Sequence, residues 1–322
     1  MRIIDRHTVA RLLTYEAAIP LMREAMTALS GGRTRQLLRQ IIPLGDGSAF
    51  GVMPGAAEMA FGAKLISVFP GNFAKGLQSH QGGVLLFDPA SGAPTALVHA
   101  GEITAIRTAA ASAAATDVLA RPDATRLAIL GYGEQALTHA RAMAHVRPLT
   151  DIRIWGRSAD KAEALAARLA AELGVPAGAA ATPKAAVAGA DIVCAVTAAR
   201  EPILSGADVA AGTHVNLVGS SVAGPREADD DLVVRSRIFA DHREGVLRQG
   251  AEVLHAIEAG LIGEDHVLGE IGEVMADLKP GRLTEADVTI YKSLGAIVQD
   301  LYAAAYVART AAEQGLGAEA AF

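Results

Sequence analysis

From about Arg126 onward, short apolar runs alternate with longer segments rich in Ala, Leu and Glu. The short runs are rich in β-branched residues and read RLAIL, DIRIW, DIVCAV, HVNLVG and RIFAD. Runs of this length, separated by helical stretches, are typical of a parallel sheet with helices on its faces. This part of the chain is therefore predicted to be α/β, with a Rossmann-type doubly wound parallel sheet.

The first 120 residues follow a different pattern. A helix-like segment over 15–30, in which Pro20 is expected to mark a kink or a boundary, precedes several strand-like runs. These runs are broken by turn residues and read RQIIPL, AFGVMP, AKLISVF, GGVLLFD and PTALV. An Ala- and Thr-rich helix is predicted over 104–120, and a long amphipathic helical pattern begins at about Asp287.

This order of elements predicts two domains, the second inserted in the first. The Rossmann domain is expected over 119–287, and a second, α+β domain is expected to combine 1–118 with 288–322. The long tail would then return the chain to the first domain.

Composition and charge exclude several classes of function. The chain is 51% hydrophobic and 20% charged, which is typical of a folded protein, and its net charge of −6 disfavours a nucleic-acid partner. No segment approaches the roughly 20 apolar residues that span a bilayer, and the N-terminus lacks the apolar core of a signal peptide. The single cysteine, Cys194, lies in an apolar run and is expected to be a buried thiol. We expect a cytoplasmic protein with no membrane contact and no metal site.

A glycine-rich turn follows the first strand of the alternating region. It has the form G-x-G-x-x-A and consists of Gly131, Tyr132, Gly133, Glu134, Gln135 and Ala136. The first glycine permits a tight turn, the second lets the backbone approach a pyrophosphate, and the alanine lets helix and strand pack closely. The N-terminus of the following helix offers unpaired N–H groups to the phosphates. The turn therefore predicts dinucleotide binding.

The second strand of this region runs into Gly156, Arg157 and Ser158, with Lys161 shortly after. A carboxylate at this place would accept hydrogen bonds from the ribose 2′-hydroxyl and favour NAD. A guanidinium, a hydroxyl and an ammonium instead suit a 2′-phosphate. These residues predict a preference for NADP(H) over NAD(H); the alternative is a solvated arginine at the start of a surface helix.

Five segments together resemble the ornithine cyclodeaminase/mu-crystallin family in order and spacing, across nearly the whole chain. They read GAKLISVFPGN, SHQGGVLLFDPASGAPTALV, EITAIRTAAASAAAT, ILGYGEQA and YKSLGAIVQD. The resemblance implies a homodimer of two-domain subunits, in which the Rossmann domain binds NAD(P) and the other domain holds the substrate and forms the dimer contact. Known members of the family act on a C=N or CH–NH bond beside a carboxylate.

The resemblance also implies the catalytic residues. Lys64 matches the family's substrate lysine, and Arg39 and Arg107 match its carboxylate-binding arginines. Two arginines suit an α-carboxylate through charge-assisted hydrogen bonds, and a lysine between apolar neighbours can have a lowered pKa that suits a proton donor. Without the resemblance, Lys64 would be interpreted as an edge-strand lysine and the arginines as members of surface ion pairs.

Further candidates for cofactor binding lie outside the glycine-rich turn. The resemblance places Ser79, His80, Lys292 and Ser293 around the nicotinamide and phosphates, and Thr197 and Ser221 are candidates as well. His80 by itself would more often be a packed or exposed histidine.

Two positions depart from the family's cyclising members. Ser221 stands where those members carry a carboxylate, and Gly51 stands where an acid is expected to hold the distal amine of ornithine. A serine cannot act as a carboxylate base at neutral pH. Both positions are instead similar to the family's NADPH-dependent ketimine reductases of the mu-crystallin type.

We therefore expect an NAD(P)H-dependent imine or ketimine reductase. Its substrate would be an α-imino carboxylate, such as the cyclic ketimine of proline or pipecolate, or iminosuccinate, and its product an amino acid. Three alternatives stay open: an amino-acid dehydrogenase of the alanine dehydrogenase type, a lyase similar to ornithine cyclodeaminase, and a non-catalytic binder of a small molecule.

Overall fold

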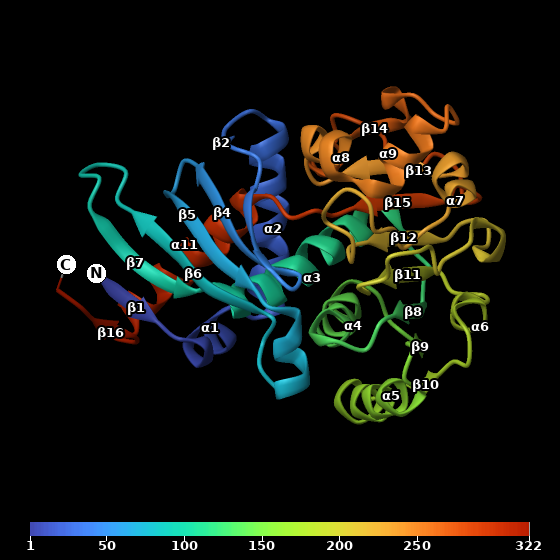
Figure 1. Ribbon diagram of the computed structural model, residues 1–322, viewed down its shortest axis with the longest axis horizontal. Coiled ribbons are helices and arrows are strands. Elements are labelled where there is room, and N and C mark those ends of the chain that lie inside the picture. The colour runs from blue at the N-terminus through green and yellow to red at the C-terminus, as the bar shows by residue number, and fades with distance from the viewer. Residues whose placement is uncertain (322) are drawn as a thin grey trace. The chain divides into compact units, whose positions relative to one another are not determined.

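The computed structural model describes residues 1–321, the side chains of residues 73 and 74 excepted. The chain forms two compact units (Figure 1). The first unit combines Met1–Arg107 with Ala296–Phe322, and the second unit is Thr108–Gly295.

The second unit is built on a sheet of eight strands, and all their pairings are parallel. The order across the sheet is β10 (Ala177–Ala179), β9 (Asp151–Trp155), β8 (Arg126–Leu130), β11 (Ile192–Ala195), β12 (His214–Leu217), β15 (Thr289–Lys292), β13 (Arg237–Ala240) and β14 (Val267–Glu270). In chain order, β9 and β10 extend the sheet on one side of β8. β11 then pairs with the other side of β8, and the later strands continue the sheet from there. The predicted Rossmann-type doubly wound sheet is confirmed.

Helices cover both faces of this sheet. α4 (Glu134–Val146) and α5 (Ala159–Leu173) lie on one side of β8 and β9, and α6 (Pro183–Val187) lies on the other (Figure 1). The remaining helices of the second unit are the end of α3 (Ala100–Leu119), α7 (Asp230–Arg235), α8 (Arg243–Gln249), α9 (Ala251–Glu258) and α10 (Ile271–Met275), with two short 3-10 turns, η2 (Gly206–Asp208) and η3 (Glu264–His266). Side chains such as Leu130, Val193 and Val215 are buried between the layers. Burial on both faces explains why these strands read as continuous apolar runs.

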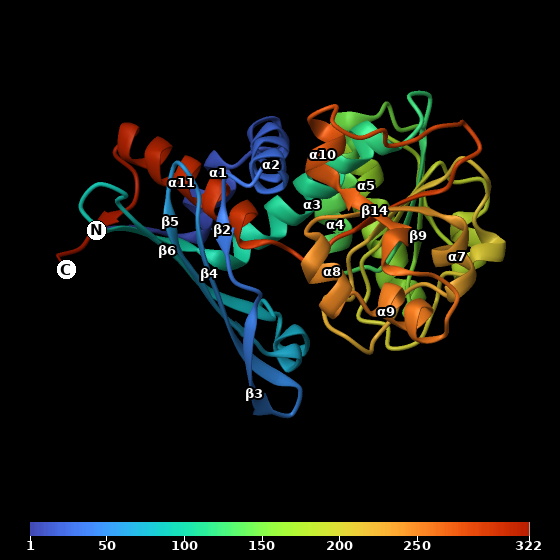
Figure 2. The ribbon, with the colours of Figure 1, turned by 90° about the horizontal axis from the view of Figure 1, so that it is seen from above.

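The first unit is built on a mixed sheet. Its strand order is β16 (Ala318–Glu319), β1 (Arg2–Ile4), β7 (Pro94–His99), β6 (His80–Phe87), β5 (Phe61–Val68), β4 (Ser48–Ala56) and β2 (Arg35–Gln36), with β3 (Gln40–Gly45) paired to β4. The helices of this unit are α1 (Arg6–Leu12), α2 (Tyr15–Ser30), the first part of α3, the 3-10 turn η1 (Pro70–Lys75) and α11 (Ile297–Glu313). α11 packs across β4 to β7 and against α2. The hairpin of β3 and β4 extends beyond these helices, and the residues of β3 are exposed (Figure 2).

The unit boundaries differ from the predicted ones at both crossings. α3 is one continuous helix, and the first boundary falls inside it after Arg107 instead of after residue 118. At the second crossing, residues 289–292 form β15 in the Rossmann sheet, where a helical tail was predicted. These four residues are buried and paired on both sides, which suits the β-branched and aromatic side chains of Thr289, Ile290 and Tyr291.

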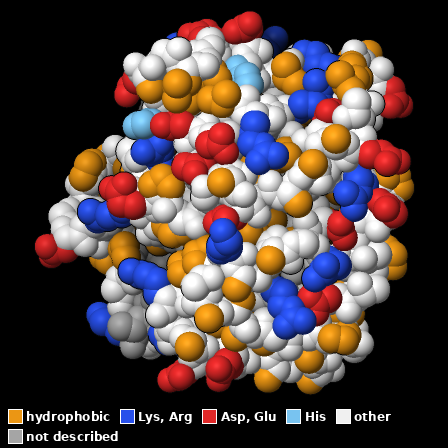
Figure 3. Space-filling model, turned by 90° about the vertical axis from the view of Figure 1, so that its right-hand side faces the viewer, with side chains coloured by type: hydrophobic (Ala, Val, Ile, Leu, Met, Phe, Trp, Pro, Cys, Tyr) orange, Lys and Arg blue, Asp and Glu red, His pale blue; other side chains and the backbone are white. Residues whose placement is uncertain are grey.

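The surface seen in Figure 3 carries basic and acidic side chains interspersed with small apolar ones. Among the described residues, none of the helices combines the length and apolar character that crossing a bilayer requires.

Candidate active site

The three cations predicted to hold the substrate all lie in the first unit. Lys64 is in β5, between β4 and β6; Arg107 is on α3; and Arg39 directly precedes β3. The Lys64 and Arg107 side chains are buried, and both Arg107 and Arg39 lie close enough to act electrostatically on Lys64. The structure therefore brings the three predicted residues together.

A buried carboxylate, Asp300 of α11, joins two of these cations. Its Oδ1 accepts hydrogen bonds from Lys64 Nζ at 3.0 Å and from Arg107 Nε at 3.2 Å. Lys64 Nζ also donates to Thr104 Oγ1 at 2.6 Å, and Arg107 Nη1 donates to Gln299 Oε1 at 2.6 Å. One carboxylate thus partners two buried cations, which leaves a net positive charge that suits an anionic ligand.

Burial strongly affects the acid–base behaviour of Lys64. It lowers the pKa of Lys64 to about 8; the charges of Arg107 and Arg39 act in the same direction, whereas Asp300 opposes them. Such an ammonium is still mostly protonated at neutral pH and can give up its proton there. The cluster can therefore bind a carboxylate and deliver a proton beside it.

Ser79 and His80 lie at the start of β6, in the same unit as the cations. Ser79 Oγ and His80 Nδ1 are 2.9 Å apart. Desolvation of the ring, with the positive charges of Lys64, Arg39 and Arg107, lowers the pKa of His80 to about 4, although the residue as a whole keeps exposed surface. His80 is therefore a neutral imidazole at physiological pH. Its predicted contact with the cofactor stays a prediction.

Sequence reasoning missed Asp300, Gln299 and Thr104. Asp300 is an acid inside the apolar run GAIVQDLYAA, and it is fully buried. A single acidic residue in an otherwise apolar helix indicates a buried ion pair, because a buried charge needs a partner. Its partners are far away in the sequence, so their identity was not visible there.

The glycine-rich turn in the second unit has the geometry that a pyrophosphate needs. Gly131 follows β8 with a φ of +132°, and a Cβ there would lie 2.9 Å from the carbonyl oxygen of Val196. Gly133 is the N-cap of α4, and the space around its missing Cβ is open. Ala136 is fully buried against the sheet, while Glu134 is exposed and Gln135 half-buried. The turn therefore fits a dinucleotide.

The turn and the end of β9 lie against each other. A Cβ on Gly156 would lie 2.1 Å from Cδ1 of the Tyr132 ring, so Tyr132 packs directly on this glycine. Lys161 Nζ lies 5.7 Å from the centroid of the same ring. Arg157 is exposed, and Ser158 is the N-cap of α5. The structure thus gathers the residues predicted to read the 2′-position of the ribose.

The other predicted cofactor residues of this unit follow neighbouring strands. Thr197 comes after β11, Ser221 after β12, and Lys292 and Ser293 stand at the end of β15. Because the strands are parallel, these positions share the edge of the sheet that carries the glycine-rich turn. Lys292 and Ser293 are buried, and Lys292 Nζ donates to the backbone oxygen of Ser220 at 2.8 Å. Lys292 therefore supports the loop after β12 from inside the unit.

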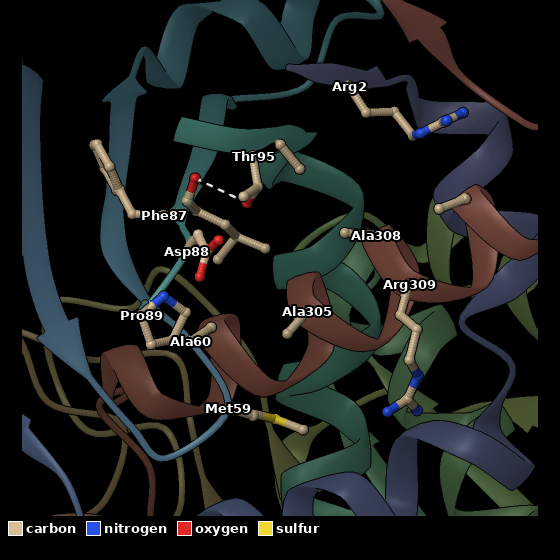
Figure 4. Close-up of a pocket in the computed structure, with 13 residues that line it drawn as sticks. Arg2, Met59, Ala60, Phe87, Asp88, Pro89, Thr95, Ala305, Ala308 and Arg309 are labelled. Atoms are coloured by element: carbon tan, nitrogen blue, oxygen red, sulfur yellow. Dashed lines mark hydrogen bonds between the residues drawn. The ribbon is translucent and has the colours of Figure 1, made fainter. Parts of the chain in front are cut away.

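An open cavity of about 350 Å³ lies elsewhere in the first unit, between α11 and the ends of β6 and β7 (Figure 4). Small or apolar side chains such as Phe87, Ala305 and Ala308 line it, together with Arg2 and Arg309. It includes none of the predicted site residues, so it has no part in the chemistry considered below.

The sequence matches a known family over almost its whole length. Residues 2–315 match the sequence model of the ornithine cyclodeaminase/mu-crystallin family. The chain is 37% identical over 295 residues to the ketimine reductase mu-crystallin of Mus musculus, covering 90% of each. It is 37% identical over 302 residues to a Δ1-pyrroline-2-carboxylate reductase of Paracoccus denitrificans, covering 90% of this chain and 93% of that one.

Solved structures are similar throughout as well. The Δ1-pyrroline-2-carboxylate reductase of Thermococcus litoralis, in complex with NADH and L-proline, has a TM-score of 0.96 and 32% identity, with 99% of this chain and 100% of that chain covered. The iminosuccinate reductase of Paracoccus denitrificans, in complex with NAD⁺, has a TM-score of 0.92 and 33% identity, with coverage of 100% and 99%. An archaeal alanine dehydrogenase dimer with bound NAD has a TM-score of 0.94 and 26% identity, with coverage of 100% and 99%.

Proposed function

Because this chain belongs to the ornithine cyclodeaminase/mu-crystallin family, we propose that it is a nicotinamide-dependent oxidoreductase that reduces the C=N bond of an α-imino carboxylate. The similar proteins named above include a ketimine reductase, pyrroline-2-carboxylate reductases and an iminosuccinate reductase. The substrate class is accordingly a cyclic ketimine of the pyrroline- or piperideine-2-carboxylate kind, or iminosuccinate. The product is the corresponding amino acid.

The observation that carries the proposal is the buried cluster of Lys64, Arg107 and Asp300, with Arg39 nearby. Arg39 and Arg107 supply the positive charge that binds a carboxylate and orients the adjacent carbon. Lys64 supplies a proton donor whose pKa is matched to neutral solution. A carboxylate next to an imine is a substrate that uses all three groups.

The reaction balances with these residues and one cofactor. When bound, the reduced nicotinamide supplies a hydride to the α-carbon. Lys64 donates a hydrogen bond or its proton to the imine nitrogen, so that the C=N bond becomes a C–H and an N–H bond. Asp300 stabilises the protonated form of Lys64 and fixes its position.

A preference for NADP(H) forms part of the proposal. It is supported by Arg157, Ser158 and Lys161, which follow β9 where an acid would favour NAD. The solved relatives described above hold NADH or NAD⁺. The preference therefore rests on the residues of this chain.

A homodimer is proposed as well. Several large apolar side chains of the first unit are exposed in β3, in the segment before it and in β5: Leu37, Ile41, Ile42, Leu44 and Leu65. Apolar groups gathered on one segment are typical of a contact between proteins. The archaeal alanine dehydrogenase of similar structure is described as a dimer.

The proposal is tested by following the oxidation of NADPH and of NADH with a small panel of substrates. The panel holds the cyclic ketimines of proline and pipecolate, iminosuccinate generated in situ, pyruvate with ammonia, and ornithine. We expect turnover of at least one α-imino carboxylate, faster with NADPH, and loss of that turnover in Lys64→Ala and Arg107→Ala.

Other outcomes would contradict the proposal. Turnover of pyruvate with ammonia alone would indicate an amino-acid dehydrogenase, and conversion of ornithine without net oxidation of the cofactor would indicate a lyase. Full activity in either variant would remove the cationic cluster from the mechanism.

A further inference from the structure

A buried carboxylate, Glu227, belongs to the loop that follows β12 and contacts the loop that follows β11. Its Oε1 accepts hydrogen bonds from the backbone N–H of Thr197 at 2.6 Å and from Thr197 Oγ1 at 2.7 Å. Its Oε2 accepts from the backbone N–H of Gly219 at 2.7 Å. Glu227 is completely buried, so one side chain holds both loops from inside the unit.

The two loops approach each other so closely that only a glycine fits at position 219. A Cβ on Gly219 would lie 2.0 Å from the backbone oxygen of Thr197 and 2.5 Å from Glu227 Oε1. The carboxylate therefore fills the space that a side chain would need. This packing indicates a fixed contact between the loops.

A second acid and a lysine extend the contact to the next residue of the β12 loop. The backbone N–H of Glu227 donates to Glu252 Oε1 at 3.1 Å, and Lys292 Nζ lies 2.8 Å from Glu252 Oε2. The same ammonium donates to the backbone oxygen of Ser220. The network thus runs from Thr197 through Glu227, Glu252 and Lys292 to Ser220. Its acids and its lysine are all buried, where water weakens the hydrogen bonds less than at the surface.

These loops lie where one half of a bound dinucleotide is expected. In a doubly wound sheet the pyrophosphate lies at the turn after the first strand, and the adenosine ribose lies at the end of the second strand, here β9. The nicotinamide half must then extend the other way, across the ends of β11 and β12. These are the ends whose loops Glu227 joins.

We propose that Glu227 is a positioning residue that makes the loops after β11 and β12 one rigid support for the nicotinamide half of the cofactor. The inference rests on the proposed function, because it requires that a nicotinamide dinucleotide binds. Hydride transfer depends on a closely fixed placement of the ring, so loops that moved independently would weaken binding of that half and slow the transfer.

The test compares two ligands in Glu227→Gln. NADPH has both halves of the dinucleotide, whereas adenosine 2′,5′-bisphosphate has only the half that lies at β9. The amide keeps the size of the side chain, but its NH2 group must face one of the N–H donors that the carboxylate now accepts from. We expect the dissociation constant of NADPH to rise about tenfold, which is the loss of roughly one charge-assisted hydrogen bond, and that of the bisphosphate to stay unchanged.

Arg157→Ser is the matched control, because it should weaken both ligands through the 2′-phosphate that they share. Equal weakening of the two ligands in Glu227→Gln would mean general damage to the domain and would overturn the inference, as would no change in either. If the wild-type protein binds no NADPH or NADH, the proposed function fails and this inference fails with it.

If Glu227→Gln does not fold, a second pair of variants tests the positioning role of Glu227. Thr197→Val removes the hydroxyl that donates to Glu227, and Thr197→Ser keeps it. The proton of that hydroxyl is directed at Glu227, and its oxygen accepts from the N–H of Ala199 at 3.2 Å. We expect NADPH binding to weaken by about threefold in the valine variant and by less in the serine variant, with the bisphosphate unaffected in both. Unchanged NADPH binding in Thr197→Val would overturn the inference.

Discussion

Asp300 shows how one residue makes a buried cluster of cations possible. Lys64 and Arg107 are both buried, and two cations without a counter-charge would repel each other at a high cost in free energy. Although burial alone would raise the pKa of Asp300, the charges of Arg107 and Lys64 hold it below its usual value. The carboxylate therefore stays ionised and keeps both cations in place without neutralising the whole cluster.

The first prediction concerns the pH dependence of imine reduction. The pKa of Lys64 is lowered to about 8, so kcat/KM should fall as the pH rises through about 8 and Lys64 loses the proton that it donates. The charge of Asp300 raises this pKa, and Asp300→Asn should therefore move the alkaline limb of the profile to lower pH. Profiles of both proteins with one substrate make the comparison, because any titration of the substrate is common to both. A limb that stays in place in the variant would contradict the role of Lys64 as the titrating group.

Cofactor preference can be tested at a single position as well. Arg157→Asp replaces a cation that suits the 2′-phosphate by an acid that repels it and accepts from a 2′-hydroxyl. The ratio of kcat/KM for NADPH to that for NADH should fall by about 10- to 100-fold, since hydrogen bonds to charged groups contribute about 1.5–3 kcal/mol. Arg153→Asp, an equal change of charge on the exposed side of β9, should leave the ratio unchanged. An unaltered ratio in Arg157→Asp would mean that this arginine is only a solvated surface residue.

At the scale of elements, the sequence predicts most of the fold because each strand carries its own local signal. The runs RLAIL, DIRIW and DIVCAV become β8, β9 and β11, and the predicted helix over 104–120 lies almost entirely within α3. The exception is the tail. Its apolar positions continue from VTIY through LGAIV into the helix, and this pattern predicts one helix where the structure has β15 followed by α11. α2 likewise runs through Pro20, because its buried face packs on the rest of the first unit and outweighs the lost hydrogen bond.

The sequence predicts only those residues of the candidate site that belong to a local motif or to the family resemblance. The glycine-rich turn is local, and its geometry follows from two glycines and an alanine. Asp300 and Glu227 are different, because their roles depend on contacts with other elements: Lys64 and Asp300 are 236 residues apart, and Thr197 and Glu227 are 30 apart. Neither role appears in any short segment, and both become visible only once the strands and α11 are placed.

At the scale of the whole molecule, each unit supplies one part of the proposed chemistry. The first unit offers the charges that bind an α-carboxylate, and the second offers the turn that binds a dinucleotide. The chain passes between them twice, through α3 and through residues 294–296. At the second passage the buried carboxylate of Asp241 accepts hydrogen bonds from the backbone N–H groups of Leu294 and Gly295, which fixes the end of the Rossmann unit.

The exposed apolar strand of the first unit leads to a prediction about assembly. Ile41 and Ile42 are neighbours in β3, so their side chains point to opposite faces, and they are 42% and 58% exposed. A strand that exposes large apolar groups on both faces is unfavourable in water unless another chain covers it. We expect a homodimer in solution, with a mass twice the 33.1 kDa of one chain by light scattering.

Ile42→Asp should convert this dimer to a monomer, because each copy would place a charge in a contact from which burial of an isoleucine contributes about 1.5–3 kcal/mol. Leu278→Asp is the matched control: Leu278 is 75% exposed and belongs to the second unit, whereas β3 belongs to the first. The control should remain dimeric. A monomeric wild-type protein would contradict the proposed dimer, and a dimer that survives Ile42→Asp would place the contact on a surface other than β3.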